Sequence, residues 1–139
     1  MSKSAQEIYD LVKTGKLNPT DLQQALGASA NAAAAVASIQ DWGVCYDSGT
    51  GQLSEFCTIV ATNPSNPITG AGMIAYTSNG STMLAVQYTN NFTSTALATS
   101  IGTVRYNPSS DGSTVLCVVY GWATSGSFYF SQPMTVGAC

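Results

Sequence analysis

The chain has 139 residues, of which only 4 are Lys or Arg and 7 are Asp or Glu, and it contains no His. This length fits one domain, or one domain with a short appendage. The hydrophobic content of 45% is enough to build a core and excludes a disordered chain. No apolar run approaches the roughly 18 residues of a membrane span, and a net charge of −3 argues against nucleic acid, which binds clustered Lys and Arg. We therefore expect neither a membrane nor a nucleic-acid partner.

The charges divide the chain into two units. Residues 1–40 contain all three lysines and carry no net charge, whereas residues 41–139 contain Arg105 as their single basic residue and are rich in Ser, Thr, Gly and Asn. Such a shift in composition marks two structural units. The start of the chain also lacks the apolar segment of a signal peptide, so we expect synthesis in the cytoplasm without export.

The first unit has the pattern of an N-terminal helical arm of two or three short helices. Ser4-Ala5-Gln6-Glu7 fits a capping box that opens the first helix. Asn18-Pro19 caps and restarts a second helix, and Ser29 caps a third that extends to Ile39. Helices this short are not stable alone in water. Their apolar stripes must therefore be buried, either against the second unit or against another protein.

The second unit has the pattern of an antiparallel β-sandwich or barrel of about seven strands. Strand-like runs alternate with turn signals at short intervals, and Asn79-Gly80 predicts a type I′ hairpin. The run Val115–Tyr120 does not alternate, which predicts a strand covered on both faces, by the helical unit or by a neighbouring subunit. The run Phe128–Phe130 does not alternate either, so its second face should also be covered by the helical unit or by a neighbouring subunit. The predicted strands are 42–47, 53–62, 71–77, 82–89, 97–106, 114–123 and 128–136.

Four cysteines, Cys45, Cys57, Cys117 and Cys139, allow three pairings if all are oxidised. Two of these pairs have spacings that suit a cross-strand bridge, Cys45 with Cys57, on neighbouring strands, and Cys117 with Cys139, and the pairing stays open. Buried thiols are the alternative. Zinc sites favour close cysteine pairs, and these cysteines are all far apart in a chain without His. We expect no metal and no other cofactor.

We expect no enzyme and no catalytic residue. Without His, the Ser-His-Asp and Cys-His arrangements are impossible. Asp47 and Glu55 flank one predicted hairpin, but we expect them to be solvated charges rather than two carboxylates facing each other across a cleft.

In size, layout and composition, the whole chain resembles the capsid cement or decoration proteins of tailed bacteriophages. A compact β domain poor in charge, a helical arm, and cysteines without an export signal carry this resemblance. It implies a non-enzymatic virion protein that binds the major capsid protein, or another virion protein, on the outer capsid surface and stabilises the shell. It also implies a homo-oligomer, a dimer or trimer, because closed symmetry repeats one contact.

Two sets of residues follow as candidate contacts on that reading. Aromatic residues are prominent in both interfaces and cores, so burial in the core is the rival interpretation of each set. The expected capsid-contact stripe is Ile8, Leu11, Val12, Leu17, Leu22 and Leu26, and the expected self-association or display set is Tyr88, Tyr120, Trp122 and Tyr129.

The alternative function is a receptor- or carbohydrate-binding β module of a phage fibre or bacterial surface. Sugar sites place exposed Trp or Tyr beside Asn, Asp and Gln. Candidates for such a site are Trp42, Tyr46, Trp122 and Asn90-Asn91. A cement protein should lose binding when residues 1–28 are removed, whereas a sugar-binding module should keep its ligand after that truncation and lose it with Trp122→Ala.

Overall fold

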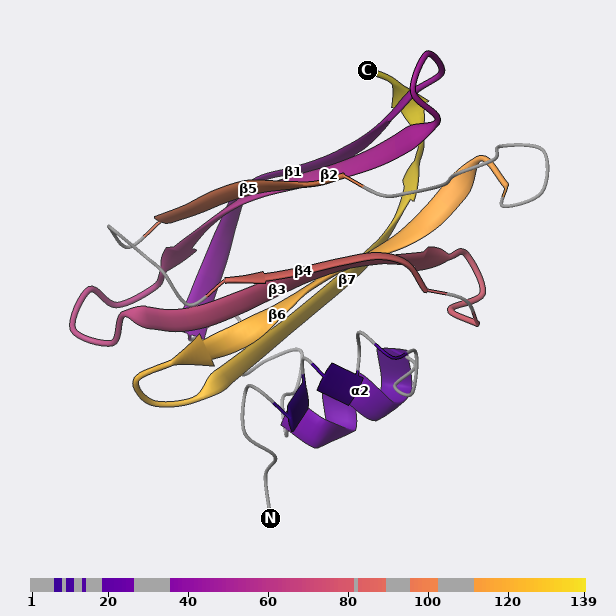
Figure 1. The fold of residues 1–139 in the computed structure, drawn as a ribbon. Helices are drawn as coiled ribbons and strands as arrows, with labels where there is room; N and C mark the ends of the chain where they lie inside the picture. The colour runs from indigo at the N-terminus through magenta and orange to yellow at the C-terminus, as the bar shows by residue number, and fades with distance from the viewer. Residues whose placement is uncertain are drawn as a thin grey trace.

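The fold is a sandwich of two four-stranded β-sheets with a helical segment beneath one of them (Figure 1). The predicted fold class, an antiparallel β-sandwich with a short N-terminal helical segment, is therefore confirmed. The structure is a computed structural model. On its fourth and fifth strands it describes the backbone, and of the side chains there it describes Leu84 alone. It describes residues 7, 8, 10, 11, 14, 19–26, 36–81, 83–89, 96–102 and 112–139.

The first sheet has the strand order β5-β2-β1-β8. Its strands are β1 (Ala37–Asp47), β2 (Gln52–Ala61), β5 (Ala96–Gly102) and the two-residue β8 (Gly137–Ala138). Strands β5, β2 and β1 pair antiparallel. Strand β8 pairs parallel to β1, and only at Cys45 and Tyr46. Within the described part of the chain, most of β1 therefore has a hydrogen-bonded neighbour on one side alone.

The second sheet has the order β4-β3-β6-β7 and is antiparallel throughout. Its strands are β3 (Ile68–Thr77), β4 (Met83–Thr89), β6 (Thr114–Ala123) and β7 (Ser127–Thr135). After β7 the chain crosses to the first sheet, and Figure 1 shows its C-terminus beside the β1–β2 turn. Each of the seven predicted strands falls on a long strand of the structure. The short β8 has no counterpart in the prediction.

The predicted hairpin at Asn79-Gly80 joins β3 to β4, but its turn is not type I′. Gly80 has φ of 74°, whereas no non-glycine among the described residues has positive φ. The Gly80 amide donates to the Thr77 carbonyl at 2.8 Å. A turn followed by one left-handed glycine is the pattern of a three-residue hairpin loop. Asn79 instead uses its Oδ1 to accept the Ser81 amide at 3.0 Å.

The predicted third helix is wrong over residues 37–39. These residues begin β1, where Ala37 pairs with Ala61 and Ile39 with Ile59. Ala37 is 1% exposed and belongs to the core between the sheets. Burial and strand pairing therefore decide the conformation of residues 37–39. The helix cap predicted at Ser29 lies outside the described residues.

The helical segment packs on the outer face of the second sheet. Residues 7, 8, 10 and 11 are helical, and α2 spans Pro19–Leu26, with Pro19 at its first position as predicted. The Ser127 hydroxyl of β7 donates to the Leu26 carbonyl at 2.8 Å and holds the end of α2 to the sheet. No helix in the described ranges is long and apolar enough to span a bilayer. The buried cluster beneath the helices is Ile8, Leu22, Leu26, Ile74, Tyr76, Val118, Tyr120 and Tyr129.

This cluster answers the question that the continuous apolar strand raised. Val115, Cys117 and Val119 face the core between the sheets, whereas Val118 and Tyr120 face the helices. The helical unit of the same chain covers the second face of β6. Of the predicted capsid-contact stripe, Ile8, Leu22 and Leu26 are buried in this cluster and Leu11 is half-buried, while Val12 and Leu17 lie outside the described residues.

The predicted cysteine pairings are wrong. One disulfide joins Cys45 to Cys139, while Cys57 and Cys117 are buried thiols. Cys45 lies opposite Ser54 and Cys57 lies opposite Trp42, so the two residues are three register positions apart. Strand β8 instead brings the C-terminus to Cys45, and the Cys139 amide donates to the Tyr46 carbonyl at 3.0 Å. Burial raises the pKa of Cys57 to about 12, which keeps this thiol protonated.

Candidate functional site

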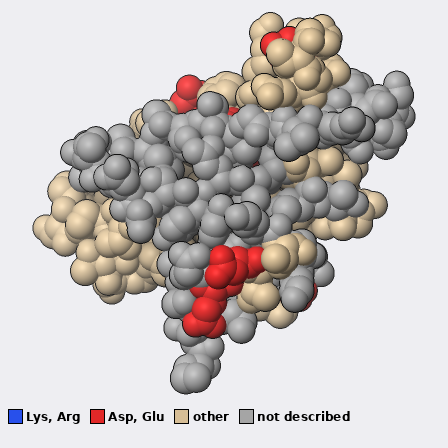
Figure 2. Space-filling view, viewed as in Figure 1, with Lys and Arg blue, Asp and Glu red and all other residues tan. Residues whose placement is uncertain are grey.

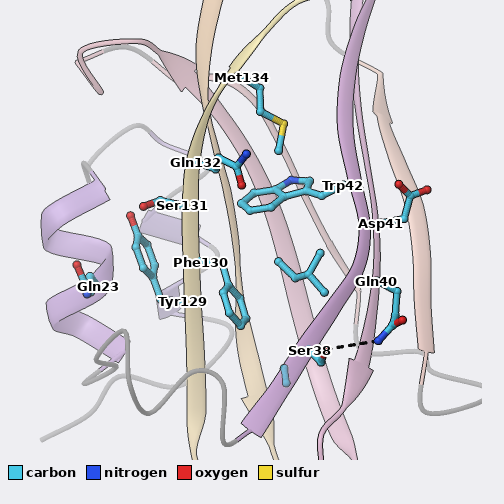
Figure 3. A pocket seen from close by; sticks show the side chains of 12 residues that line it. Gln23, Ser38, Gln40, Asp41, Trp42, Tyr129, Phe130, Ser131, Gln132 and Met134 are labelled. Atoms are coloured by element: carbon cyan, nitrogen blue, oxygen red, sulfur yellow. Dashed lines mark hydrogen bonds between the residues drawn. The ribbon is translucent and has the colours of Figure 1, made fainter.

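A cleft of about 760 Å³ lies where the edges of the two sheets leave the sandwich open. Strand β7 is the last strand of its sheet, and β8 covers only the far end of β1. The cleft runs between these two strands, with α2 beside it (Figure 3). Its lining is Gln23, Ala37, Ser38, Ile39, Gln40, Asp41, Trp42, Tyr129, Phe130, Ser131, Gln132 and Met134.

The interior of the cleft is aromatic and apolar. Figure 3 shows Trp42, Phe130 and Met134 between β1 and β7, with Gln132 near the Trp42 ring. All three apolar side chains are half-buried and pack against the core between the sheets. Alternation along β7 explains the set, because residues two apart on a strand face the same side. Tyr129 points the other way, toward α2.

A β-bulge in β1 places Trp42 in the cleft. The register changes between Ile39, which pairs with Ile59, and Asp41, which pairs with Thr58, so Gln40 is the extra residue. Before the bulge the odd-numbered residues face inward, and after it the even-numbered ones do. Bulges commonly redirect side chains at sheet edges. Here the bulge brings both Ile39 and Trp42 to the inner face.

The rim of the cleft is polar and holds one exposed carboxylate. Gln40 and Asp41 are exposed on β1, and Gln40 Nε2 donates to Ser38 Oγ at 3.4 Å. None of the twelve lining residues is basic. Figure 2 shows a red patch over the helical segment, where Glu7, Asp10 and Asp21 are exposed, while all four basic residues of the chain lie outside the described residues.

A buried carboxyl group lies behind the cleft. Glu55 is 1% exposed, and its Oε2 accepts the indole N–H of Trp42 at 2.8 Å. Burial raises the pKa of Glu55 well above its usual range, although hydrogen bonds from Trp42 and Cys117 oppose that rise. The carboxyl group is therefore biased toward its neutral form.

The expectation that Glu55 is a solvated charge is wrong. Strand β2 alternates, and its inward positions are Leu53, Glu55, Cys57, Ile59 and Ala61. Asp47 is exposed at the end of β1, opposite Gln52, while Glu55 lies opposite Val44. The two carboxyl groups thus lie apart. The period-two pattern around Glu55 was the signal that could have revealed its burial.

The predicted display aromatics do not form one exposed surface. Tyr120 and Tyr129 are 0% and 7% exposed beneath the helices. Trp122 is half-buried, with its ring edge-on to Tyr120 at 6.0 Å between centroids and 82° between planes. The side chain of Tyr88 lies outside the description. The burial of the three described residues fits their interpretation as core residues. Self-association through them stays a prediction, and it would need their side chains to become exposed.

Among the predicted sugar-binding residues, Trp42 alone lines the cleft. Tyr46 is half-buried against the core between the sheets, Trp122 lies on the helical side, and Asn90 and Asn91 lie outside the described residues. Sequence reasoning missed Phe130, Gln132 and Met134, because β7 could not be identified as an edge strand from its pattern.

The chain matches no known family model and no curated protein. Among solved structures it is similar in part to the crystal structure of DesR, a beta-glucosidase from Streptomyces venezuelae in complex with D-glucose. The TM-score is 0.40 and the sequence identity 9%, and the match covers 70% of this chain and 15% of that chain. No activity is assigned on that likeness. Within the described ranges, no three His, Cys, Asp or Glu residues gather where they could hold a metal ion.

Proposed function

We propose that the chain is a non-catalytic carbohydrate-binding β module, displayed on a phage fibre or a bacterial surface. The observation that carries this proposal is the half-buried Trp42 indole inside the cleft between β1 and β7. Ligand sites are concave, mainly apolar, and contain a few placed polar groups. This cleft is concave, and its twelve lining residues divide equally between apolar or aromatic side chains and polar ones.

A sugar ring fits the chemistry of the lining. Sugars have an apolar face of C–H groups that packs on an aromatic ring and an edge of hydroxyl groups that both donate and accept hydrogen bonds. Trp42 and Phe130 supply aromatic surface. Gln23, Gln40 and Gln132 supply amide groups that can donate and accept. The amides therefore match a row of hydroxyl groups better than they match a charged ligand.

The charge of the lining favours an uncharged sugar. Asp41 is the one exposed carboxylate among the lining residues, and no lining residue is basic. An acidic sugar would approach the Asp41 carboxylate, and none of the described lining residues supplies a cation to offset the repulsion. We therefore expect neutral hexose polymers or N-acetylated sugars to bind, and uronic acids not to bind.

The test is titration calorimetry with cellohexaose, chitohexaose, mannohexaose and trigalacturonate, after a glycan array to widen the search. Trp42→Ala should abolish binding of whichever neutral oligosaccharide binds the wild type, because it removes the platform. Gln132→Ala, an exposed position, should weaken binding by about 5-fold, the worth of one hydrogen bond.

Two variants serve as controls away from the cleft. Phe56 is 40% exposed on the outer face of the first sheet, opposite Gly43, and Trp122 lies on the helical side. Phe56→Ala and Trp122→Phe should bind as the wild type does. Wild-type affinity in both Trp42→Ala and Gln132→Ala would overturn the site, and no binding to any glycan would overturn the function.

The capsid-cement function stays a prediction. For the expected contact to form, Ile8, Leu22 and Leu26 would have to leave the cluster in which they are buried. Stoichiometric binding to empty phage shells, lost when residues 1–28 are removed, is the result that would support it.

A further inference from the structure

Glu55 is a buried acid whose position the fold alone does not require. It lies on β2 between the inward residues Leu53 and Cys57, and it is 1% exposed. Its Oε1 has no hydrogen-bond partner in the described part of the chain. The Cys117 thiol of β6 is the other polar group at the carboxyl. An apolar residue of similar size would fill this place without an unpaired polar atom.

Burying such a group has a cost. A buried polar group without full hydrogen bonding is destabilising. Replacing both partners of a buried polar pair by apolar groups of the same shape is often neutral or stabilising, whereas removing one partner is costly unless the other can reach water. The 2.8 Å hydrogen bond from Trp42 Nε1 to Glu55 Oε2 offsets part of this cost, and the hydrogen bond from the Cys117 thiol offsets a smaller part. The acid therefore gives the indole N–H an acceptor on the core side of the cleft.

That hydrogen bond fixes the orientation of the ring. Trp42 is half-buried, so its two-ring system extends from the core side, where the N–H is held, to the cleft, where Figure 3 shows it between β1 and β7. A tryptophan with a buried N–H needs a partner there. Without an acceptor, the N–H would turn toward water in the cleft and the aromatic face would leave its place.

We propose that Glu55 is the positioning residue of the cleft, which holds the Trp42 indole as a fixed platform for an uncharged sugar ring. The proposal rests on the proposed function for its ligand, but the Glu55–Trp42 geometry can be tested without any ligand. A platform that is ordered before binding improves affinity because less conformational entropy is lost on binding. Glu55 acts through Trp42 and itself need not touch the sugar.

The first experiment reads the indole directly. In a Trp122→Phe background Trp42 is the only tryptophan, since the chain has two, and its indole N–H gives one NMR cross-peak. We expect slow hydrogen exchange of this N–H in the parent and in Glu55→Gln, whose amide oxygen can accept the same bond. In Glu55→Met we expect exchange to be at least 10-fold faster and acrylamide quenching of Trp42 fluorescence to increase.

The second experiment separates positioning from stability. With cellohexaose, chitohexaose or mannohexaose, whichever binds the parent, we expect Glu55→Gln to bind within about 2-fold of the parent. Glu55→Met should bind at least 5-fold more weakly while its melting temperature is unchanged or higher. If Glu55 had a merely structural role, Glu55→Met would lower the sugar affinity and the melting temperature together, or would lower neither. Glu55→Leu gives the same comparison if Glu55→Met does not fold.

Two results would overturn the proposal: an indole N–H in Glu55→Met that exchanges as slowly as in the parent, or parent-like sugar affinity in that variant despite a freed indole. If no sugar binds the parent, the proposed function fails, and the exchange experiment still decides whether Glu55 holds Trp42. The two failures are thus distinguishable.

Discussion

The two sheets of the sandwich are buried to very different extents. In the second sheet, seven consecutive residues of β3, from Gly70 to Tyr76, are buried, and β6 is buried continuously from Cys117 to Gly121. In the first sheet β2 alternates between buried and exposed positions, and most of β1 is half-buried or exposed. The difference arises because the described helical residues cover the outer face of the second sheet (Figure 1).

This asymmetry separates what stabilises the molecule from what can bind a ligand. The second sheet is a middle layer, held by apolar burial on both faces. Among the described residues, the first sheet has no layer on its outer face and most of β1 has one unpaired edge, which forms one wall of the cleft. Its far end is held covalently, because Cys45 of β1 is bonded to Cys139. Each of the following predictions tests one side of this division.

The largest expected effect is the loss of the disulfide. The bridge closes a sequence separation of 94 residues, and a loop of that order contributes about 4 kcal/mol to stability. We expect Cys45→Ser/Cys139→Ser to lose about that much in urea denaturation. Amide exchange should accelerate in β1 before it does in β6, because β8 no longer holds the end of the first sheet.

Reduction of the wild type provides the matching measurement. One bridge predicts an intact mass higher by two hydrogens after reduction, with Cys57 and Cys117 as thiols in both states. Reductant should not change the stability of the double variant. A gain of four hydrogens, or equal acceleration of exchange in β1 and β6, would contradict the assignment of the bridge to the first sheet.

The next effect tests the helix-covered sheet. Leu22 of α2 is 0% exposed and packs in the cluster with Ile74, Val118 and Tyr120. Leu22→Ala should lower the free energy of unfolding by about 3 kcal/mol, because it creates a cavity in a packed core. Gln24→Ala, an exposed position on the same helix, should change it by less than about 0.5 kcal/mol.

The same variant tests whether the two sides are independent. The cluster that contains Leu22 is distinct from the core that contains Trp42 as a partly buried neighbour. Sugar affinity at 10 °C, measured once circular dichroism shows that Leu22→Ala is folded there, should fall by no more than the loss of the Gln23 contact from α2. A stability loss below about 1 kcal/mol would mean that the helices do not hold the second sheet.

Local patterns were enough to predict the sandwich. The alternation in β2, the turn signals, and the unbroken apolar run in β6 each reflect which faces are covered, and coverage is a local property of a strand. The short apolar stripes around Leu22 predicted burial, but two partners were possible. The structure places them on the same chain, which no local pattern could decide.

The site depended on features that periodicity does not reveal. A single extra residue, Gln40, reverses the facing of β1 and turns Trp42 inward. The position of β7 at a sheet edge is a matter of strand order, which pairs residues far apart in sequence. The pairing of Cys45 with Cys139 likewise needed β8, a two-residue strand too short to recognise. Glu55 was the exception, since its burial follows from the alternation of β2.

The smallest expected effect, taken per pH unit, is a pH dependence confined to the first sheet. The pKa of Glu55 is raised by burial in the fold above about 4.3 in the unfolded chain. The stability that its neutral form contributes is therefore complete below pH 4 and is lost as pH rises toward the folded pKa. Relative to Glu55→Gln, the wild type should lose up to about 1.4 kcal/mol per pH unit over that window.

Urea denaturation at one-unit intervals from pH 4 to pH 8 measures this difference. The groups facing the carboxyl do not titrate there, because burial raises the pKa of both the Cys57 and the Cys117 thiol, and Asp41, nearest to Cys57, is present in both variants. The difference between wild type and Leu22→Ala should stay constant over the same range. Parallel curves for wild type and Glu55→Gln would mean that Glu55 is charged in the fold, and that the indole of Trp42 binds a carboxylate rather than a neutral acid.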